Sequence, residues 1–459
     1  MVYYHCIVVG AGLAGLRIAH ELKKQNNKHQ SVLVLESREE AGGRVRTEYL
    51  DSKTKQHVMY ESGPWRIAEE HRRVLGLFKE MKVSLLPLKT PTPKYGSPSV
   101  VIPGLSSWDT SALTERNPLL ADEIDLSTSY ADETHSASGS APYSVDTEQF
   151  FFAPTGFTSV ITKLSENLPI DYNCRVADVH RLQNGKYVLT TVVRKGKSKF
   201  IQTQSVQCSH LFVCTPPAAC SNWHIFREHA KSVMSAVEPG QLHHVYVQDS
   251  RFPRHTHSLH PTSLLSQTIS SQYDHSHFFQ AAYTGGRLAR FWHNLKLQNA
   301  VEFFLLLKEE VMKATGFRIA KGAVVKSHYW PMGYHIWRTV PNFNLKKSVR
   351  LSICPNPIDL PNVYLAGEAF SSHQAWMEGA LETADLALAS FYDPPPFKQP
   401  DKGDTTVEGR VISLSKWANV HPGGKSAIVD HKGEDLAALL SHFGHSPHAW
   451  AVVHSLKKG

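Results

Sequence analysis

The hydrophobic pattern at the start of the chain predicts a strand, a glycine turn, a helix and a second strand, in that order. Residues 3–9 are apolar and rich in β-branched side chains, and Gly10 ends the run. Leucine and alanine then recur at the spacing of one helix face, from Leu13 to Leu22, before residues 31–36 form a second apolar run. This order predicts a βαβ unit with parallel strands and a right-handed connection.

Two polar stretches divide the rest of the chain, and hydrophobic patterns typical of strands and helices lie between them. Residues 85–146 are dominated by Pro, Ser, Thr and Gly, which predicts a loop-rich insertion that is partly mobile or lines an entrance. Residues 394–404 read as a polar linker that contains proline, so a small separate unit is expected over 405–459. Between these stretches we expect strands over 187–193, 210–215 and 362–366 and helices over 301–314 and 376–391.

The composition is that of an ordinary folded protein. Hydrophobic residues make up 41% of the 459 residues and charged residues 20%, which excludes wholesale disorder. The 49 basic and 41 acidic side chains leave a net charge of +8, but the sequence holds no long basic block, so nucleic-acid binding is not expected. The longest aliphatic or aromatic run covers only 303–307, so no membrane span is expected.

Two further features of the sequence favour a location inside the cell. The first predicted strand begins almost at Met1, so no secretory signal is expected and the cytoplasm is the expected location. The six cysteines are scattered and form no C-x-x-C pair. This spacing argues against a disulfide framework or a cysteine zinc site, and it favours a reducing compartment.

The glycines after the first predicted strand have the spacing of a dinucleotide-binding turn. Gly10, Gly12 and Gly15 follow a strand and open a helix, and Glu36 ends the next strand. In such a turn the first glycine permits the tight bend, the second lets backbone N–H groups approach a pyrophosphate, and the third lets helix and strand pack closely. Glu36 can accept hydrogen bonds from ribose hydroxyls, which argues against a 2′-phosphate. A glycine turn without a ligand is the alternative.

The next residues distinguish FAD from NAD. Gly42, Gly43 and Arg44 lie in a segment that resembles the double-glycine motif of FAD enzymes of the amine oxidase family. Two more glycines allow the backbone to approach a cofactor, and Arg44 or Arg46 can neutralise a phosphate. The resemblance implies that this segment passes close to the pyrophosphate and ribityl chain of FAD. Otherwise Arg44 would be a surface arginine beside a glycine turn.

A second segment of the same family pattern lies more than 300 residues downstream. Gly367 and Glu368, followed by Trp376 and Met377, resemble the second FAD-binding segment of amine oxidases. The resemblance implies that Glu368 bonds the ribityl chain. It also implies that the Met377 backbone, at a helix start, faces the pyrimidine carbonyl of the flavin. Val176 is also included among the expected cofactor-binding positions.

The resemblance covers most of residues 1–393 and implies an α/β fold. A Rossmann-type FAD-binding domain with the GxGxxG turn would be interleaved with a mixed α/β substrate domain, and a small α+β tail would follow. The FAD-binding domain would be discontinuous. The expected ranges are 1–66, 156–240 and 352–393 for the FAD-binding domain, 67–155 and 241–351 for the substrate domain, 394–404 for the linker and 405–459 for the tail.

One short stretch bears on the substrate. It consists of Gly63, Pro64, Trp65 and Arg66. The stretch resembles the G-[PA]-M-R segment of L-amino acid oxidases and tryptophan monooxygenases, with tryptophan in place of the usual methionine, and it is expected beside the cofactor. In those enzymes the arginine takes the substrate α-carboxylate, for which a planar guanidinium is well matched. The alternative is that Arg66 pairs with an acid of the protein, such as Glu61.

Residues 328–337 supply candidate walls of the substrate pocket. They resemble the segment before the reactive face of the flavin in bacterial L-amino acid oxidases. On this ground Tyr334, His335 and Trp337 are candidate pocket residues, and Trp376 would form an aromatic wall. Each could equally be a core residue, because aromatic clusters more often serve packing than catalysis.

The sequence departs from the family pattern at one position. Many members carry a lysine that holds a water near flavin N5, whereas the corresponding stretch here holds His243 and His244. The alignment favours His243 as the counterpart of the lysine. The alternative is that both histidines are ordinary strand residues.

The C-terminal unit resembles the haem-binding core of cytochrome b5. It holds His421 in an HPGG sequence, and His445 follows 24 residues later, which is the family spacing between two axial haem ligands. Paired imidazoles give a six-coordinate iron suited to electron transfer. The unit lacks the family's first strand, helix and second strand, and about 55 residues are marginal for an independent core. Bound haem b, contacts with the oxidase part, or a relic without haem are the alternatives.

Together these resemblances predict an FAD-dependent oxidoreductase of the amine oxidase family that most resembles L-amino acid oxidases. The expected reaction removes a hydride from Cα–H of an L-amino acid or related amine and gives an imine, with Arg66, His335 and Trp376 as catalytic residues. Electrons would pass to O2 or to the b5-like haem. The alternatives are a monoamine or polyamine oxidase or another desaturating flavoenzyme, a non-catalytic binding protein similar to GDP-dissociation inhibitors, and a redox sensor.

Overall fold

The computed structural model describes most of the first 393 residues and two short strands beyond them. The described ranges are 1–24, 31–89, 149–194, 201–260, 263–338, 345–356, 359–393, 404–407 and 410–413. The insertion predicted over 85–146 and the unit predicted over 405–459 therefore lie largely outside the described residues. The two candidate haem ligands, His421 and His445, also lie outside them.

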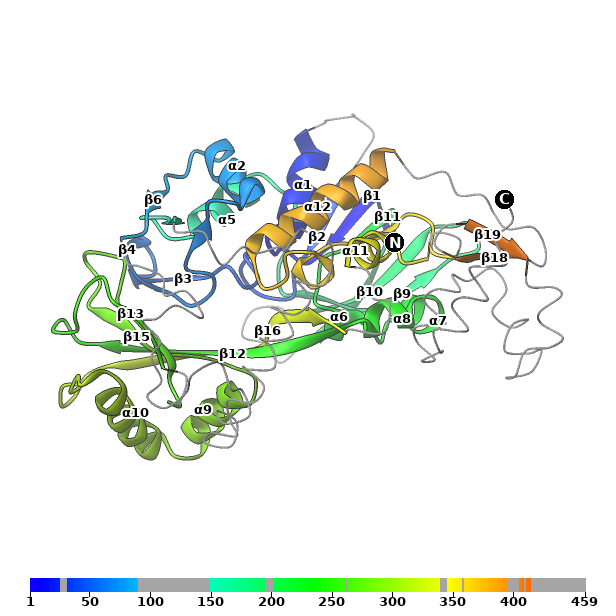
Figure 1. The fold of residues 1–459 in the computed structure, drawn as a ribbon. Helices are drawn as coiled ribbons and strands as arrows, with labels where there is room; N and C mark the ends of the chain where they lie inside the picture. The colour runs from blue at the N-terminus through cyan, green and yellow to red at the C-terminus, as the bar shows by residue number, and fades with distance from the viewer. Residues whose placement is uncertain are drawn as a thin grey trace, which may run out of the picture.

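A seven-stranded sheet forms the centre of one half of the molecule (Figure 1). Its order is β8-β2-β1-β11-β10-β9, with β17 also paired to β11. Neighbours are parallel except β9 with β10 and β10 with β11. The strands are β1 (Val2–Val9), β2 (Val32–Leu35), β8 (Ile170–Asp171), β9 (Cys174–Arg181), β10 (Tyr187–Arg194), β11 (Ile201–Val213) and β17 (Val363–Leu365).

The predicted βαβ unit is present in this sheet. It consists of β1, helix α1 (Leu13–Lys24) and β2, and the two strands pair in parallel. Alternate residues of a strand point to opposite faces of its sheet. Accordingly, Val8 belongs to one buried cluster, whereas Ile7 and Val9 belong to another. Both faces of the sheet are therefore covered, as is usual where strands are parallel.

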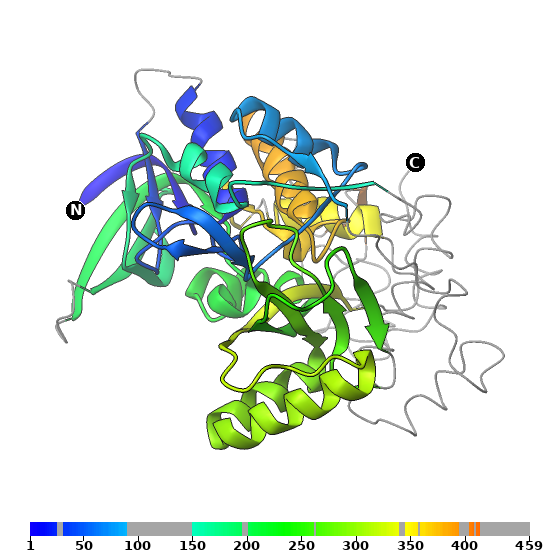
Figure 2. The same cartoon turned by 90° about the vertical axis from the view of Figure 1, so that its left-hand side faces the viewer.

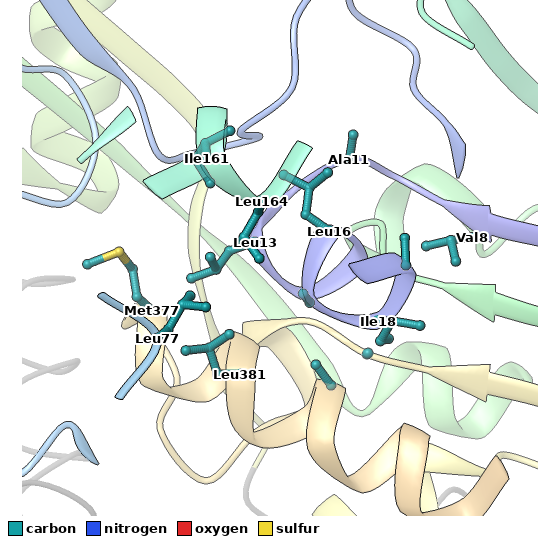
Figure 3. Close-up of a cluster of buried hydrophobic side chains, with 14 of the residues drawn as sticks. Val8, Ala11, Leu13, Leu16, Ile18, Leu77, Ile161, Leu164, Met377 and Leu381 are labelled. Atoms are coloured by element: carbon teal, nitrogen blue, oxygen red, sulfur yellow. The ribbon is translucent and has the colours of Figure 1, made fainter. Parts of the chain in front are cut away.

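Helices from distant parts of the chain cover the first face of the sheet. They are α1, α2 (Arg72–Glu80), α5 (Thr158–Ser165) and α12 (Met377–Tyr392). Figure 3 shows where they meet, with Leu16, Ile161 and Leu381 among the labelled side chains of the cluster. Burying one such side chain contributes about 1.5–3 kcal/mol. This cluster therefore holds the two FAD-related segments of the sequence against one another.

Shorter helices lie at the second face. They are α6 (Pro217–Cys220), α7 (His224–His229) and α8 (Lys231–Ser235). Helix α11 (Leu345–Ile353) contributes to both clusters, with Val349 in the second and Ile353 in the first. Trp223, Phe226 and Val349 are buried in this second cluster. The 3₁₀ helix η2 (Glu368–Phe370) follows β17 and also contributes Phe370 to it.

A five-stranded antiparallel sheet forms the other half of the molecule. Its order is β13-β14-β15-β12-β16, and helices α9 (Gly286–Gln298) and α10 (Ala300–Thr315) pack against it (Figure 2). Trp292 and Leu307 are fully buried between them. The strands are β12 (Val237–Gln248), β13 (His257–His260), β14 (Ser266–Ile269), β15 (Phe278–Gly285) and β16 (Val325–Trp337).

The long strands β12 and β16 link the two halves (Figure 1). Val237 and Trp337 at one end belong to the second cluster of the parallel sheet, whereas Val245 and Val247 belong to the core beneath α9 and α10. The boundary predicted between 240 and 241 therefore lies inside a strand that serves both halves.

Smaller sheets complete the described part of the chain. A hairpin is formed by β3 (Thr47–Asp51) and β4 (Gln56–Glu61). A three-stranded sheet is formed by β5 (Ile67–Ala68), β7 (Phe150–Phe152) and β6 (Leu86–Pro87). Strands β18 (Asp404–Val407) and β19 (Arg410–Ser413) form an antiparallel pair. Within the described ranges, no helix combines the length and the hydropathy needed to cross a membrane.

The elements predicted from the pattern are confirmed. The strands predicted over 3–9, 31–36, 187–193 and 362–366 correspond to β1, β2, β10 and β17, and the predicted helices correspond to α10 and α12. The strand predicted over 210–215 is the end of the longer β11. The pattern does not predict β13 and β14, because histidine, serine and glutamine occupy many of their positions.

Candidate active site

Two of the three glycines after β1 are required by packing. Gly10 has φ +101°, and its N–H donates to the Leu35 carbonyl at 2.8 Å. A Cβ on Gly10 would lie 2.8 Å from the Cys214 carbonyl oxygen. A Cβ on Gly15 would lie only 2.0 Å from the Gly10 carbonyl oxygen. The turn and helix α1 therefore approach each other as closely as the motif predicts.

Gly12 differs from its two neighbours because its free side is open. A Cβ built there has no heavy atom within 4 Å. The double-glycine segment closes the other side, since the Gly42 N–H donates to the Ala11 carbonyl at 2.8 Å. Gly43, at φ +59°, places its Cβ position 3.2 Å from the Gly12 Cα. The two glycine motifs thus form one cradle whose open side fits a pyrophosphate.

Glu36 lies at the edge of this cradle and is nearly buried. Its Oε2 accepts the Ala11 N–H at 2.7 Å, and its Oε1 accepts the Arg38 N–H at 2.8 Å and the Ser37 hydroxyl at 3.2 Å. A carboxylate offers about four acceptor positions, so Oε2 retains one for a further donor. The geometry therefore fits the predicted contact with a ribose hydroxyl.

The cradle leads to a prediction that separates folding from cofactor binding. Gly15→Ala should lower the free energy of unfolding of the FAD-free protein by about 1–3 kcal/mol, because the new methyl meets backbone. Gly12→Ala should leave that free energy within about 0.5 kcal/mol of wild type and still weaken FAD binding. Urea unfolding and fluorescence titration with FAD measure the two quantities. Unchanged FAD affinity in Gly12→Ala would mean that the cofactor does not pass this glycine.

Glu368 connects the second FAD-related segment to β16 and to the double-glycine segment. Its side chain is 4% exposed. Oε1 accepts the backbone N–H groups of His335 at 2.8 Å and Ala375 at 2.7 Å. Oε2 lies 3.0 Å from His335 Nδ1 and 2.8 Å from Arg44 Nη2. Arg44 also donates to the Gly333 carbonyl at 3.0 Å. Arg44 is therefore not an isolated surface arginine.

These contacts keep Glu368 ionised. Burial alone would raise the pKa of its carboxyl, but the charge of Arg44 and the hydrogen bonds from His335 and Ala375 outweigh burial and lower the pKa to about 2. Each carboxylate oxygen already has two partners, so the predicted bond from Glu368 to the ribityl chain would require one of them to move. That bond stays a prediction.

Arg66 is surrounded by aromatic rings from three separate segments. Its guanidinium carbon lies 4.5 Å from the centroid of Phe150, 4.7 Å from Trp65 and 5.7 Å from Trp376. These cation–π contacts hold the charge in a partly desolvated position. The residue predicted to take a carboxylate and the tryptophan predicted as a pocket wall are therefore neighbours. Phe150 is a further member of this cage that the sequence gives no signal for.

Two histidines lie near this cage, and burial keeps both of them neutral. The ring of His71 lies 4.7 Å from the ring of Trp376, and burial lowers the pKa of His71 to about 4, with His373 and Arg66 adding to the effect. Burial likewise lowers the pKa of His257 to about 4; its ring lies 5.8 Å from that of Trp65. The positive charge of Arg66 is therefore flanked by uncharged imidazoles at neutral pH.

The Glu61 carboxylate accepts hydrogen bonds from three other residues. Its Oε1 accepts the Tyr273 hydroxyl at 2.7 Å and the Phe157 N–H at 3.0 Å, and its Oε2 accepts the Thr47 hydroxyl at 2.8 Å. Burial raises the pKa of this carboxyl to about 7, against the effect of these hydrogen bonds. The sequence left open a pairing of Arg66 with Glu61. These contacts of Glu61 do not include Arg66.

The structure separates the two histidines that the sequence left as alternatives. His243 faces α9, with its ring 6.2 Å from that of His293. His244 faces the opposite way, where its Nδ1 lies 3.1 Å from the Tyr246 hydroxyl, which in turn donates to the Glu61 carbonyl. Burial lowers the pKa of both histidines to about 3. Consecutive strand residues point to opposite faces of a sheet. His244 therefore faces the segment that leads into Gly63, whereas His243, which the sequence favours as the counterpart of the family's lysine, does not.

The remaining predicted positions have mainly structural contacts. A Cβ on Gly63 would lie 1.9 Å from the Arg44 carbonyl oxygen, so this glycine permits close packing. Trp337 donates through Nε1 to the Ser371 carbonyl at 2.9 Å and is buried. Val176 is buried in the second cluster, and Met377, the first residue of α12, is buried in the first. Pro64 is half-buried beside Gly63. The roles of these residues toward a cofactor stay predictions.

Two family models match the chain. The model described as "Flavin containing amine oxidoreductase" matches residues 13–102 and 111–387, which is well over half of the chain. The model described as "Cytochrome b5-like Heme/Steroid binding domain" matches residues 397–459. The first match implies FAD as the cofactor, and the cradle at Gly12, Gly43 and Glu36 fits that molecule. The second match allows a haem.

Curated relatives align with a short part of the chain. The L-amino-acid oxidase of Vipera ammodytes ammodytes is 41% identical over 81 residues, which are 18% of this chain and 16% of the relative. The L-amino acid dehydrogenase of Synechocystis sp. is 38% identical over 82 residues, with the same two shares. The chain therefore matches only about a sixth of the length of these relatives.

Solved structures of amine oxidases match nearly the whole described fold. A putrescine oxidase variant has a TM-score of 0.58 at 13% identity, covering 86% of this chain and 100% of its own. A cyclohexylamine oxidase from Brevibacterium oxydans has a TM-score of 0.57 at 15% identity, covering 84% and 98%. At such identities the likeness shows the fold, and it confirms the predicted mixed α/β architecture of FAD-dependent amine oxidases. The chain belongs to the flavin containing amine oxidoreductase family, with a cytochrome b5-like domain at its C-terminal end.

Proposed function

We propose that this enzyme oxidises the CH–NH2 group of an L-amino acid to an imine, with FAD as its cofactor. The observation that carries the proposal is the position of Arg66, whose guanidinium lies among Trp65, Phe150 and Trp376. Trp376 belongs to the second FAD-related segment, so a carboxylate on Arg66 would be close to the cofactor site. A simple amine has no group that would need this arginine.

The residues that would hold FAD come from three parts of the chain. The glycine cradle would receive the pyrophosphate, Glu36 a ribose, and the region of Gly43, Gly367 and Met377 the rest of the molecule. A Cβ on Gly367 has no heavy atom within 4 Å, so the chain leaves space beside this residue. When bound, FAD supplies the acceptor for the hydride that leaves Cα. The protein supplies orientation and excludes water.

Arg66 would fix the orientation of the substrate. A bidentate contact with the α-carboxylate defines where the Cα–H bond points. The aromatic rings around the guanidinium reduce its exposure to water, and an ion pair is stronger in such surroundings. Hydrolysis of the imine would give a keto acid and ammonia. The electrons would pass to O2 or to a haem b held by His421 and His445.

The first experiment is an anaerobic visible spectrum of the purified full-length protein, before and after a pool of L-amino acids is added. Bleaching of the flavin bands is expected. A Soret band that shifts at the same time would support the b5-like haem as the electron acceptor. Flavin bands that persist with amino acids but bleach with the corresponding amines would replace this proposal with an amine or polyamine oxidase. A protein that lacks flavin bands after loading with FAD would refute a redox function.

A further inference from the structure

The aromatic cage around Arg66 is built from three separate segments of the chain. Trp65 is the sequence neighbour of Arg66, Trp376 directly precedes helix α12, and Phe150 is the first residue of strand β7. Phe150 has the nearest ring: its centroid lies 4.5 Å from the guanidinium carbon, against 4.7 Å for Trp65 and 5.7 Å for Trp376. The closest contact of the cage therefore comes from a strand that belongs to neither FAD-related segment.

The backbone of Phe150 is fixed to the short strand that directly follows Arg66. In the antiparallel pair of β5 with β7, Phe150 lies opposite Ala68, which is two residues after Arg66. On the other side of β7, the Phe150 carbonyl accepts the Leu88 N–H at 2.7 Å. A shift of the Phe150 ring along its strand would break this register. The main chain therefore holds the ring and the arginine in a defined relation to one another.

Strand β7 is a run of three phenylalanines whose rings have different surroundings. Phe151 packs against the first buried cluster of the parallel sheet, and Phe152 is buried in a small cluster with Tyr273. Among these three rings, the contact with the Arg66 guanidinium belongs to Phe150. Consecutive strand residues point to opposite faces, so Phe151 is a matched control on the same strand.

A guanidinium that is held in place before binding gives a higher affinity. An arginine side chain has several rotatable bonds, and a ligand that must immobilise such a side chain binds more weakly. The electron-rich face of an aromatic ring attracts the cation, so the ring restricts the arginine already in the free protein. Arg66 and Phe150 are both half-buried, and this attraction is stronger where water is partly excluded.

We propose that Phe150 is a positioning residue for the reaction, whose ring face holds the Arg66 guanidinium where it receives the substrate α-carboxylate. In this role Phe150 acts through Arg66 rather than on the reacting atoms. The inference rests on the proposed function, because a substrate without a carboxylate gains nothing from the position of Arg66. It deepens that function by naming a second residue on which recognition of the carboxylate depends.

The test is anaerobic stopped flow on the holoenzyme, which gives the substrate Kd and the limiting rate of flavin reduction for the L-amino acid that reduces the wild type fastest. Phe150→Leu keeps an apolar side chain but removes the ring, and it should raise Kd about 3- to 30-fold. Phe150→Tyr keeps an aromatic face and should stay within about twofold of wild type. Phe151→Leu should match wild type. Equal Kd values for Phe150→Leu and wild type would overturn the inference.

A double-mutant cycle with Arg66→Met separates positioning of the arginine from packing of the strand. The quantity compared is the second-order rate constant of flavin reduction. Without the guanidinium the ring has no cation to hold, so Phe150→Leu should have no further effect in the Arg66→Met background. A loss by the same factor in both backgrounds would show that Phe150 acts through the packing of β7, and the inference would be wrong.

Fluorinated phenylalanines in place of Phe150 keep the outcome clear if Phe150→Leu folds poorly. Each fluorine withdraws electron density from the ring face and weakens its attraction for a cation, with little change in shape. Kd should therefore rise stepwise as fluorines are added, whereas a ring that serves only packing gives no trend. A flat series in an enzyme that L-amino acids do reduce would refute the inference alone. Failure of every L-amino acid to reduce wild-type flavin would instead refute the proposed function and the inference together.

Discussion

Arg66→Met is expected to slow flavin reduction by L-amino acids, measured as kcat/KM, roughly 30- to 1,000-fold. The estimate takes about 2–4 kcal/mol for removing one partner of a desolvated, bidentate charge pair, at 1.36 kcal/mol per factor of ten. The guanidinium is half-buried and lies over three aromatic rings, so water cannot replace it well. Methionine keeps much of the apolar contact with the rings and removes only the charge and its hydrogen bonds.

The division of this loss between KM and kcat carries further information. If Arg66 holds the carboxylate equally in the ground state and the transition state, KM rises and kcat is retained. If it also aligns Cα–H for hydride loss, kcat falls as well. Arg66→Lys should recover only part of the rate, because an ammonium lacks the planar fork of a guanidinium.

The matched control is Arg254→Met, which removes an exposed arginine of the half built on the five-stranded sheet. This arginine lies 3.7 Å from Asp274. The kinetic constants of this variant should equal those of wild type. Equal turnover of every accepted L-amino acid by Arg66→Met and wild type would exclude the carboxylate role. A loss in Arg66→Met that is the same for an amino acid and its decarboxylated amine would also exclude that role, because only the amino acid carries the group that Arg66 is proposed to bind.

Glu368→Ala is expected to lower the free energy of unfolding by about 3–5 kcal/mol. The substitution leaves the Arg44 guanidinium, the His335 ring and two backbone N–H groups without their shared acceptor in a buried site. Glu368→Gln should cost less, because the amide oxygen still accepts the two backbone N–H groups of His335 and Ala375. Urea unfolding at matched FAD occupancy measures the difference.

The same carboxylate predicts a pH dependence. The pKa of Glu368 in the folded protein is lowered to about 2 from an ordinary value near 4.5, so the folded state favours its ionised form. This preference contributes about 3 kcal/mol of stability that is complete above pH 4.5 and is lost as the pH falls toward 2. Wild type should therefore lose more stability than Glu368→Ala over this range.

An exposed ion pair supplies the control for this prediction. Glu309 lies 2.6 Å from Lys313 on α10, and both side chains are about 60% exposed. Glu309→Ala should unfold within error of wild type, because surface pairs contribute little. If Glu368→Ala proved as stable as Glu309→Ala, the buried contacts around Glu368 would not be holding η2, β16 and the Arg44 segment together.

The sequence by itself determined the dinucleotide-binding turn and most strands of the parallel sheet, and the family and fold class followed from the resemblance of the motifs at Gly42 and Gly367. These conclusions rest on local patterns: the apolar runs of β1 and β2, the spacing of Gly10, Gly12 and Gly15, and a second motif at Gly367. Each pattern reflects a requirement that neighbouring residues alone can satisfy, such as a tight turn at φ +101° or the close approach of a helix to its strand. The choice of Arg66 for the substrate came from a resemblance.

Only the tertiary structure decided which distant side chains meet. It brought Phe150 to Arg66, joined Arg44 and His335 through Glu368, and assigned the carboxylate of Glu61 to Tyr273 and Thr47. It also showed that His244 rather than His243 faces the segment before Gly63. Because side chains alternate along a strand, His243 and His244 must point to opposite faces of their sheet. Which of these faces meets the other half of the molecule depends on how the two sheets are joined. That arrangement arises from contacts across hundreds of residues, which no local pattern records.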